Sequence, residues 1–129
     1  MKIAGPVCGL LLLSACATTA SLESRVEDRA MARWDALLSG DLAGAYEYLS
    51  PGIRSSISSL EYQRSVLLNP IQWTSVKYIN HECKETTCKV MIKLAFKVSG
   101  VLPGVPSMEE EMDISESWIL TAGEWYFVP

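Results

Sequence analysis

The chain has 129 residues, with 11 Lys and Arg against 15 Asp and Glu, and a formal net charge of −4. This length suits one domain of ordinary size that can bury a core. A mildly acidic chain with scattered basic residues argues against nucleic acid as a partner and against binding to anionic lipid through a polybasic segment.

The first fifteen residues have the pattern of a secretory signal. One positive charge, Lys2, precedes a run from Ile3 to Ala15 that is almost wholly apolar or small. This run is too short for a membrane-spanning helix, which needs roughly 20 apolar residues. A charged start, a short apolar centre and small residues at the end are typical of a signal that is removed on export. We therefore expect residues 1–15 to be absent from the mature protein.

The end of this signal, Leu13-Ser14-Ala15-Cys16, resembles the lipobox of bacterial lipoproteins. The resemblance implies cleavage before Cys16 and attachment of fatty-acid chains such as palmitate to its sulfur. Each buried acyl CH₂ contributes roughly 0.8 kcal/mol, so two or three chains hold a domain on a membrane. The resemblance also implies the periplasmic face of the outer membrane, because Ala17 stands where an Asp would signal retention in the inner membrane. The alternative is an ordinary signal peptide with a chance cysteine.

Two of the four cysteines remain for the mature domain, since Cys8 leaves with the signal and Cys16 carries lipid. An even pair in an exported domain, here Cys83 and Cys88, predicts a disulfide. The intervening KETT can form a four-residue hairpin loop that sets the two cysteines opposite each other on adjacent strands. Zinc held by His81 and both cysteines is the alternative, but three ligands without a fourth make a poor structural site. We expect no metal and no cofactor.

Residues 16–20 are expected to form a short tether, and residues 21–129 a single domain that begins with helices. The first helix is predicted from Ser21 or from a capping box at Ser24 to a stop at Gly40. A short helix capped by Asp41 follows, Ser50-Pro51 is typical of a helix start, and a third helical segment spans 59–68. Six residues of the first helix recur at helical spacing and form its apolar stripe: Leu22, Val26, Ala30, Trp34, Leu37 and Leu38.

After residue 70 the apolar pattern alternates, which predicts strands over 71–82, 88–98, 109–121 and 125–128. The polar positions of the second strand are rich in Lys, and those of the third are rich in Glu and Asp. Opposite charges across a strand pair are mildly stabilising, so these strands are predicted to be antiparallel neighbours. The expected fold class is α+β: N-terminal helices packed on a curved four-stranded antiparallel sheet.

Three stretches, RWDALLSGDLAGAYEYLSP, EYQ and LTAGEWYFVP, make residues 21 to 128 similar to the nuclear-transport-factor-2-like superfamily. The resemblance implies a cone-shaped domain of the cystatin-like type. Its members include enzymes, such as ketosteroid isomerase and limonene epoxide hydrolase, as well as ligand-binding and interaction domains. The resemblance therefore leaves the activity open.

Four residues are the candidate lining of a pocket inside such a cone: Trp34, Tyr46, Glu116 and Trp118. Glu116 breaks the alternation of its strand, because it shares the apolar face of Met112, Ile114 and Trp118. A carboxylate in an apolar pocket is a candidate general base. The favoured interpretation is that Glu116 reaches solvent or an arginine, in which case its replacement by glutamine should destabilise the protein little.

No catalytic motif is found, and no catalytic residue is assigned. The expected function is that of a lipid-anchored, non-catalytic domain of the cell envelope. It would act through protein contacts, as a homodimer or as an accessory to an envelope assembly. The alternatives are a binder of a small apolar ligand in the cone and, less favoured, an isomerase- or hydratase-type enzyme. The apolar VLPGVP loop is a candidate contact with a partner or a membrane.

Overall fold

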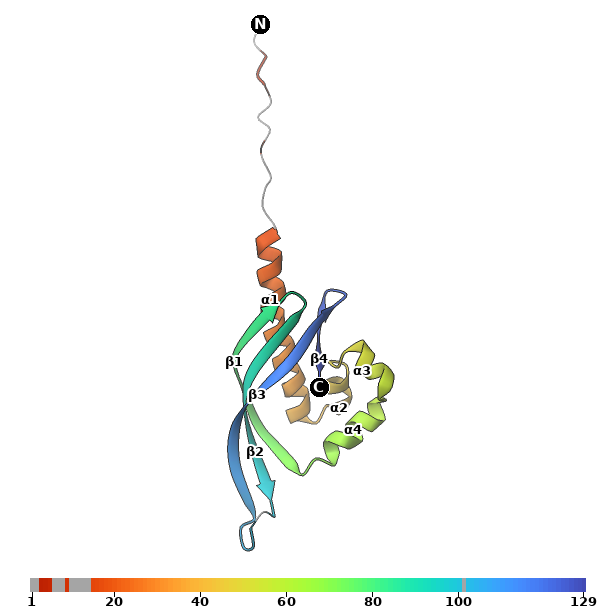
Figure 1. Cartoon of the computed structure of the whole chain (residues 1–129), viewed down its shortest axis with the longest axis vertical. Helices are drawn as coiled ribbons and strands as arrows, with labels where there is room; N and C mark the ends of the chain where they lie inside the picture. Colours follow the sequence, from red (N-terminus) through yellow and green to blue (C-terminus); the bar gives the residue numbers. More distant parts are fainter. Residues whose placement is uncertain (1–2, 6–8, 10–14, 101) are drawn as a thin grey trace.

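The structure is a computed structural model that describes residues 3–5, 9, 15–100 and 102–129; the side chains of the first helix are described from Leu22 onward. Four helices precede four strands: α1 (Ala15–Ser39), α2 (Leu42–Tyr46), α3 (Pro51–Ser56), α4 (Ser59–Leu67), β1 (Ile71–Lys84), β2 (Thr87–Ser99), β3 (Ser107–Thr121) and β4 (Glu124–Val128). The strands form one antiparallel sheet in the order β1-β2-β3-β4 (Figure 1). The α+β class and the order of helices and strands are as predicted.

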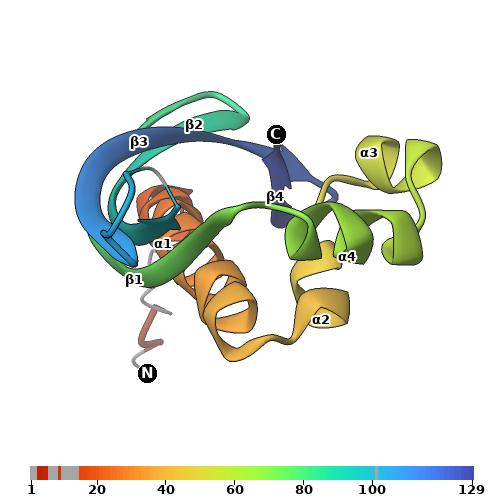
Figure 2. The same cartoon turned by 90° about the horizontal axis from the view of Figure 1, so that it is seen from below.

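Helix α1 lies inside the curve of the sheet (Figure 2). Its apolar stripe is buried there, with Val26 and Ala30 at 0% exposure. The predicted start at Ser21 or Ser24 was wrong: α1 begins at Ala15, and no Gly or Pro interrupts residues 15–24. Residues 16–20, expected as a tether, therefore lie in its first turns. Much of the predicted signal and the side chain of Cys16 lie outside the described residues.

The three short helices begin where the sequence predicts. Asp41 accepts a hydrogen bond from the Gly44 amide at 3.0 Å, and Ser50 caps α3 with proline at its first position. Ser58 forms a reciprocal capping box with Glu61 at the start of α4. The chain turns extended at Ile57, so residues 51–67 form two helices and the total is four rather than three. These helices cover the open side of the sheet beside β4 (Figure 2).

The register of the sheet confirms the predicted antiparallel pairing of β2 with β3. Lys93 stands opposite Asp113 and Lys97 opposite Glu109, with nitrogen–oxygen distances of 3.0 and 3.9 Å. Within the described residues, no helix is both long and apolar enough to cross a membrane.

The predicted disulfide between Cys83 and Cys88 is confirmed, and the two residues are opposed across β1 and β2. The hairpin loop is shorter than the predicted KETT. Pairing continues to Lys84 and Thr87, and Glu85 turns the chain with a positive φ of 57°.

Candidate functional site

Glu116 is the buried carboxylate of the inner sheet face, 4% exposed between Ile114 and Trp118 on β3. Three donors reach it. Arg33 donates from Nη1 and Trp34 from Nε1 to Oε2, both at 2.9 Å. Trp118 donates from Nε1 to Oε1 at 3.2 Å. Two helix residues and a residue of the same strand thus surround one carboxyl group.

Arg33 supplies the balancing charge from α1. It is only 7% exposed, and its guanidinium carbon lies 3.6 Å from the centre of the Phe127 ring on β4. One Arg33 donor, Nε, is buried without a hydrogen-bond partner among the described residues. Arg33 and Glu116 therefore form a desolvated ion pair that joins α1 to β3, with the Phe127 ring over the guanidinium.

The geometry of this pair favours a structural role for Glu116. A general base needs a carboxylate oxygen free to face the proton that it removes. Both oxygens of Glu116 already accept hydrogen bonds, and Arg33 balances the charge at short range. The carboxylate is therefore committed to holding the helix on the sheet.

Two cavities flank the ion pair. The larger, called here the helical cleft, holds about 400 Å³; it is lined by Arg33, Leu49, Ile53, Ile57, Tyr62, Ser65, Val66, Asn69, Trp73, Phe127 and Pro129. A neighbouring cavity of about 330 Å³ borders Glu116 and Trp34. Arg33, Phe127 and Pro129 line both cavities. Both open to the surface beside the buried core, and the helical cleft has mostly apolar walls with one guanidinium.

The structure brings together three of the four residues expected to line a pocket: Trp34, Glu116 and Trp118. Tyr46 does not share their contacts. Its hydroxyl donates to the Ile57 carbonyl at 2.7 Å, and its ring lies 5.8 Å from that of Tyr62, so it fastens α2 to the following helices.

Arg33 is the site residue that sequence reasoning missed, because the predicted stripe of the first helix included only apolar residues. A signal for it exists in the sequence. Val26, Ala30, Arg33 and Leu37 follow one another at spacings of four, three and four, which puts Arg33 on the buried stripe. A cation that interrupts an apolar helix stripe matches an anion that interrupts an apolar strand face. Each irregularity predicts the other.

The hairpin that carries His81 offers no zinc site. Cys83 and Cys88 are bonded to each other. The His81 ring is hydrogen-bonded through Nδ1 to the Tyr78 hydroxyl. Within the part of the chain that the structure describes, no cluster of three His, Cys, Asp or Glu could hold a metal ion.

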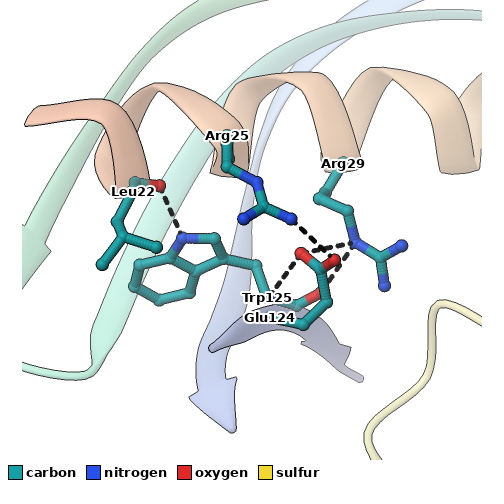
Figure 3. A network of polar contacts seen from close by, with 5 residues as sticks. All are labelled: Leu22, Arg25, Arg29, Glu124 and Trp125. Atoms are coloured by element: carbon teal, nitrogen blue, oxygen red, sulfur yellow. Dashed lines mark hydrogen bonds and ion pairs between the residues drawn. The ribbon is translucent and has the colours of Figure 1, made fainter. Parts of the chain in front are cut away.

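A second polar network fastens α1 to the start of β4 (Figure 3). Trp125 donates from Nε1 to the Leu22 carbonyl at 2.7 Å. Arg25 reaches a Glu124 oxygen at 2.9 Å, and Arg29 donates to the Trp125 carbonyl at 2.9 Å. We call these five residues the helix clasp. The helix clasp fixes α1 to the sheet near the point where its first turns project past the strands (Figure 1).

No family model matches the chain, and no curated protein matches it in sequence. Solved structures do resemble it. A SEC-C motif-containing protein from Rhodopseudomonas palustris matches with a TM-score of 0.61 and 16% identity, over 85% of this chain and 84% of that one. A SEC-C motif-containing protein from Psychrobacter arcticus matches with a TM-score of 0.59 and 12% identity, over 81% of this chain and 58% of that one. At this identity the likeness shows a shared fold.

Proposed function

We propose that this protein is a lipid-anchored domain of the bacterial cell envelope that works by binding and not by catalysis. The lipobox-like sequence that ends in Cys16 supports the anchor, and the periplasmic face of the outer membrane is the proposed location. We include membership of the nuclear-transport-factor-2-like superfamily in the proposal. Two features support this membership: the helices lie against a curved sheet (Figure 2), and an open cleft lies among residues of both.

The observation that carries the proposal is that Cys16, the proposed lipid site, lies at the start of a long helix that is fastened to the sheet. Cys16 is the second residue of α1, a helix of 25 residues, which at 1.5 Å per residue is about 37 Å long. The helix clasp holds this helix to β4. An acyl anchor at Cys16 would therefore join the domain through a stiff helix and set its orientation relative to the membrane.

This orientation bears on the apolar loop between β2 and β3. Leu102 is 52% exposed and Val105 is 38% exposed. The loop lies at the end of the sheet opposite the N-terminus of α1 (Figure 1). With the lipid at Cys16, the loop faces away from the anchoring membrane, so contact with a protein partner is favoured over contact with that membrane.

Metabolic labelling with an alkyne analogue of palmitate tests the anchor. The wild-type chain and a Cys8→Ala variant are expected to take up the label, because Cys8 leaves with the signal. A Cys16→Ala variant is expected to lose it. Equal labelling of the Cys16→Ala variant, or no label on the wild-type chain, would contradict the proposal.

A second candidate function, binding of a small apolar ligand, is favoured by the helical cleft. Its volume of about 400 Å³ lies within the range of small-molecule sites. The dye 1-anilinonaphthalene-8-sulfonate, which joins an apolar ring system to an anion, is a suitable probe for apolar walls beside Arg33. Saturable dye fluorescence should disappear in an Ile57→Trp variant that fills the cleft. It should persist in a Leu60→Trp variant, since Leu60 is 58% exposed and does not line the cleft. Equal binding by both variants would count against the cleft.

A further inference from the structure

The first part of β3 is a sheet edge with one neighbour. β2 pairs with β3 from Ser107 to Ile119, whereas β4 pairs only with Ser117 to Thr121. Residues 107–116 therefore have a second side on which no strand of the described chain pairs; we call this side the β3 edge (Figure 1). Its backbone N–H and C=O groups can accept another strand.

The β3 edge is more regular than the other outer edge of the sheet. β1 has register shifts against β2 between Trp73 and Ser75 and again between Tyr78 and Asn80. Such irregularities twist an edge strand and hinder further pairing. β3 keeps its register with β2 without a shift from Ser107 to Ile119. Of the two outer edges, the β3 edge is the one shaped to pair with an incoming strand.

Charge decides which strand can bind there. Four exposed acidic residues lie along the edge: Glu109, Glu110, Glu111 and Asp113. Lys97 and Lys93 pair with Glu109 and Asp113. Glu110 and Glu111 are exposed and form no ion pair among the described residues, so two negative charges are left over.

A second copy of this chain is a poor occupant of the β3 edge. Pairing of two such edges would set acidic residues beside acidic residues, and like charges on neighbouring strands are destabilising. A basic strand would instead set positive charges beside these carboxylates, and opposite charges on neighbouring strands are stabilising. On one face it would lie beside Glu109, Glu111 and Asp113, and on the other beside Met108, Glu110 and Met112. A strand that alternates basic with apolar residues fits both faces.

We propose that the β3 edge binds, by strand addition, an extended segment of another protein in which Lys or Arg alternates with apolar residues. This inference rests on the proposed binding function and names its surface and the chemistry of its partner. Main-chain hydrogen bonds hold the added strand in place. The unpaired carboxylates select its charge and speed its association.

The test uses the full chain, with or without lipid, so that failure of the anchor and failure of this inference are distinguishable. The probe is a fluorescent nonapeptide that alternates lysine with valine (KVKVKVKVK). Its control is a peptide of the same composition without the alternation (KKKVVVVKK). We expect saturable binding of the alternating peptide, at least about tenfold weaker binding of the control, and slower hydrogen exchange over residues 107–116 in the complex.

Matched variants test the part played by charge. Glu110→Gln with Glu111→Gln removes two charges and leaves both lysine ion pairs in place; binding is expected to weaken by about tenfold. Glu23→Gln with Asp28→Asn removes two exposed charges from α1 and should leave binding unchanged. Equal binding of both peptides, unchanged hydrogen exchange over residues 107–116, or equal effects of the two double variants would overturn the proposal. Dimerisation through the β3 edge would also overturn it.

Discussion

Replacement of Glu116 by glutamine is expected to lower the free energy of unfolding by about 3–5 kcal/mol, the usual cost of breaking a buried ion pair from one side. The side chains of Arg33 and Glu116 are only 8% and 4% exposed, so Arg33 would keep a charge that water cannot reach. The new amide group also faces a donor whichever way it turns. Oε2 accepts from Arg33 and Trp34, and Oε1 accepts from Trp118. The sequence alone led us to expect a small effect; the burial of this ion pair leads us to expect a larger one.

Urea unfolding followed by tryptophan fluorescence, with the disulfide intact, measures this cost. Arg33→Met alone should cost a similar amount, because it leaves the carboxylate unpaired. Combination of Arg33→Met with Glu116→Gln should cost less than the sum of the two, since no buried charge remains. Asp113→Asn breaks a surface ion pair with Lys93; the Asp113 side chain is 51% exposed and that of Lys93 is 43% exposed. This change should cost about 0–1 kcal/mol. Additive effects at Arg33 and Glu116, or a Glu116→Gln cost no larger than that of Asp113→Asn, would refute the buried-pair account.

Two further predictions concern the β1 region. Replacement of both Cys83 and Cys88 by alanine should cost about 2 kcal/mol, the value that chain entropy gives for a short closed loop; an unchanged urea midpoint would contradict it. Burial, followed by the negative charge of Glu27, raises the pKa of Tyr78 above its ordinary value of 10.0. The folded state therefore holds this proton more tightly, and the associated stability is present below pH 10.0 and is lost as the pH rises toward the raised pKa. A Tyr78→Phe variant should lose a late phase in the absorbance titration of tyrosinate and should show a flatter pH dependence of unfolding above pH 10.0; an unaltered titration would count against this assignment.

Local patterns in the sequence were sufficient to predict most of the fold. Capping residues such as Asp41 and Ser58 mark helix starts because their side chains bond backbone groups within one turn. Alternation marks the strands, and the Lys and acidic faces of β2 and β3 predict their pairing. The disulfide was predictable because both cysteines lie in one hairpin. In each case the interacting residues are near in sequence or share a simple period.

The features that sequence reasoning missed depend on tertiary packing. The Arg33–Glu116 contact joins residues 83 positions apart. The sequence suggested solvent or an arginine as the partner of Glu116, but it could not say which arginine. Tyr46 was grouped with the cone because it is aromatic, but the path of the chain after α2 brings its hydroxyl to Ile57 instead. The β3 edge was not inferred either, although the predicted strands over 109–121 and 125–128 already differ in length.

The mass of the N-terminal peptide, measured on protein extracted from membranes, tests the central claim most directly. The account predicts a peptide that begins at Cys16 and carries the added mass of two or three acyl chains. A peptide of unmodified mass, or one that begins at another residue, would contradict the proposed anchor and with it the location in the envelope.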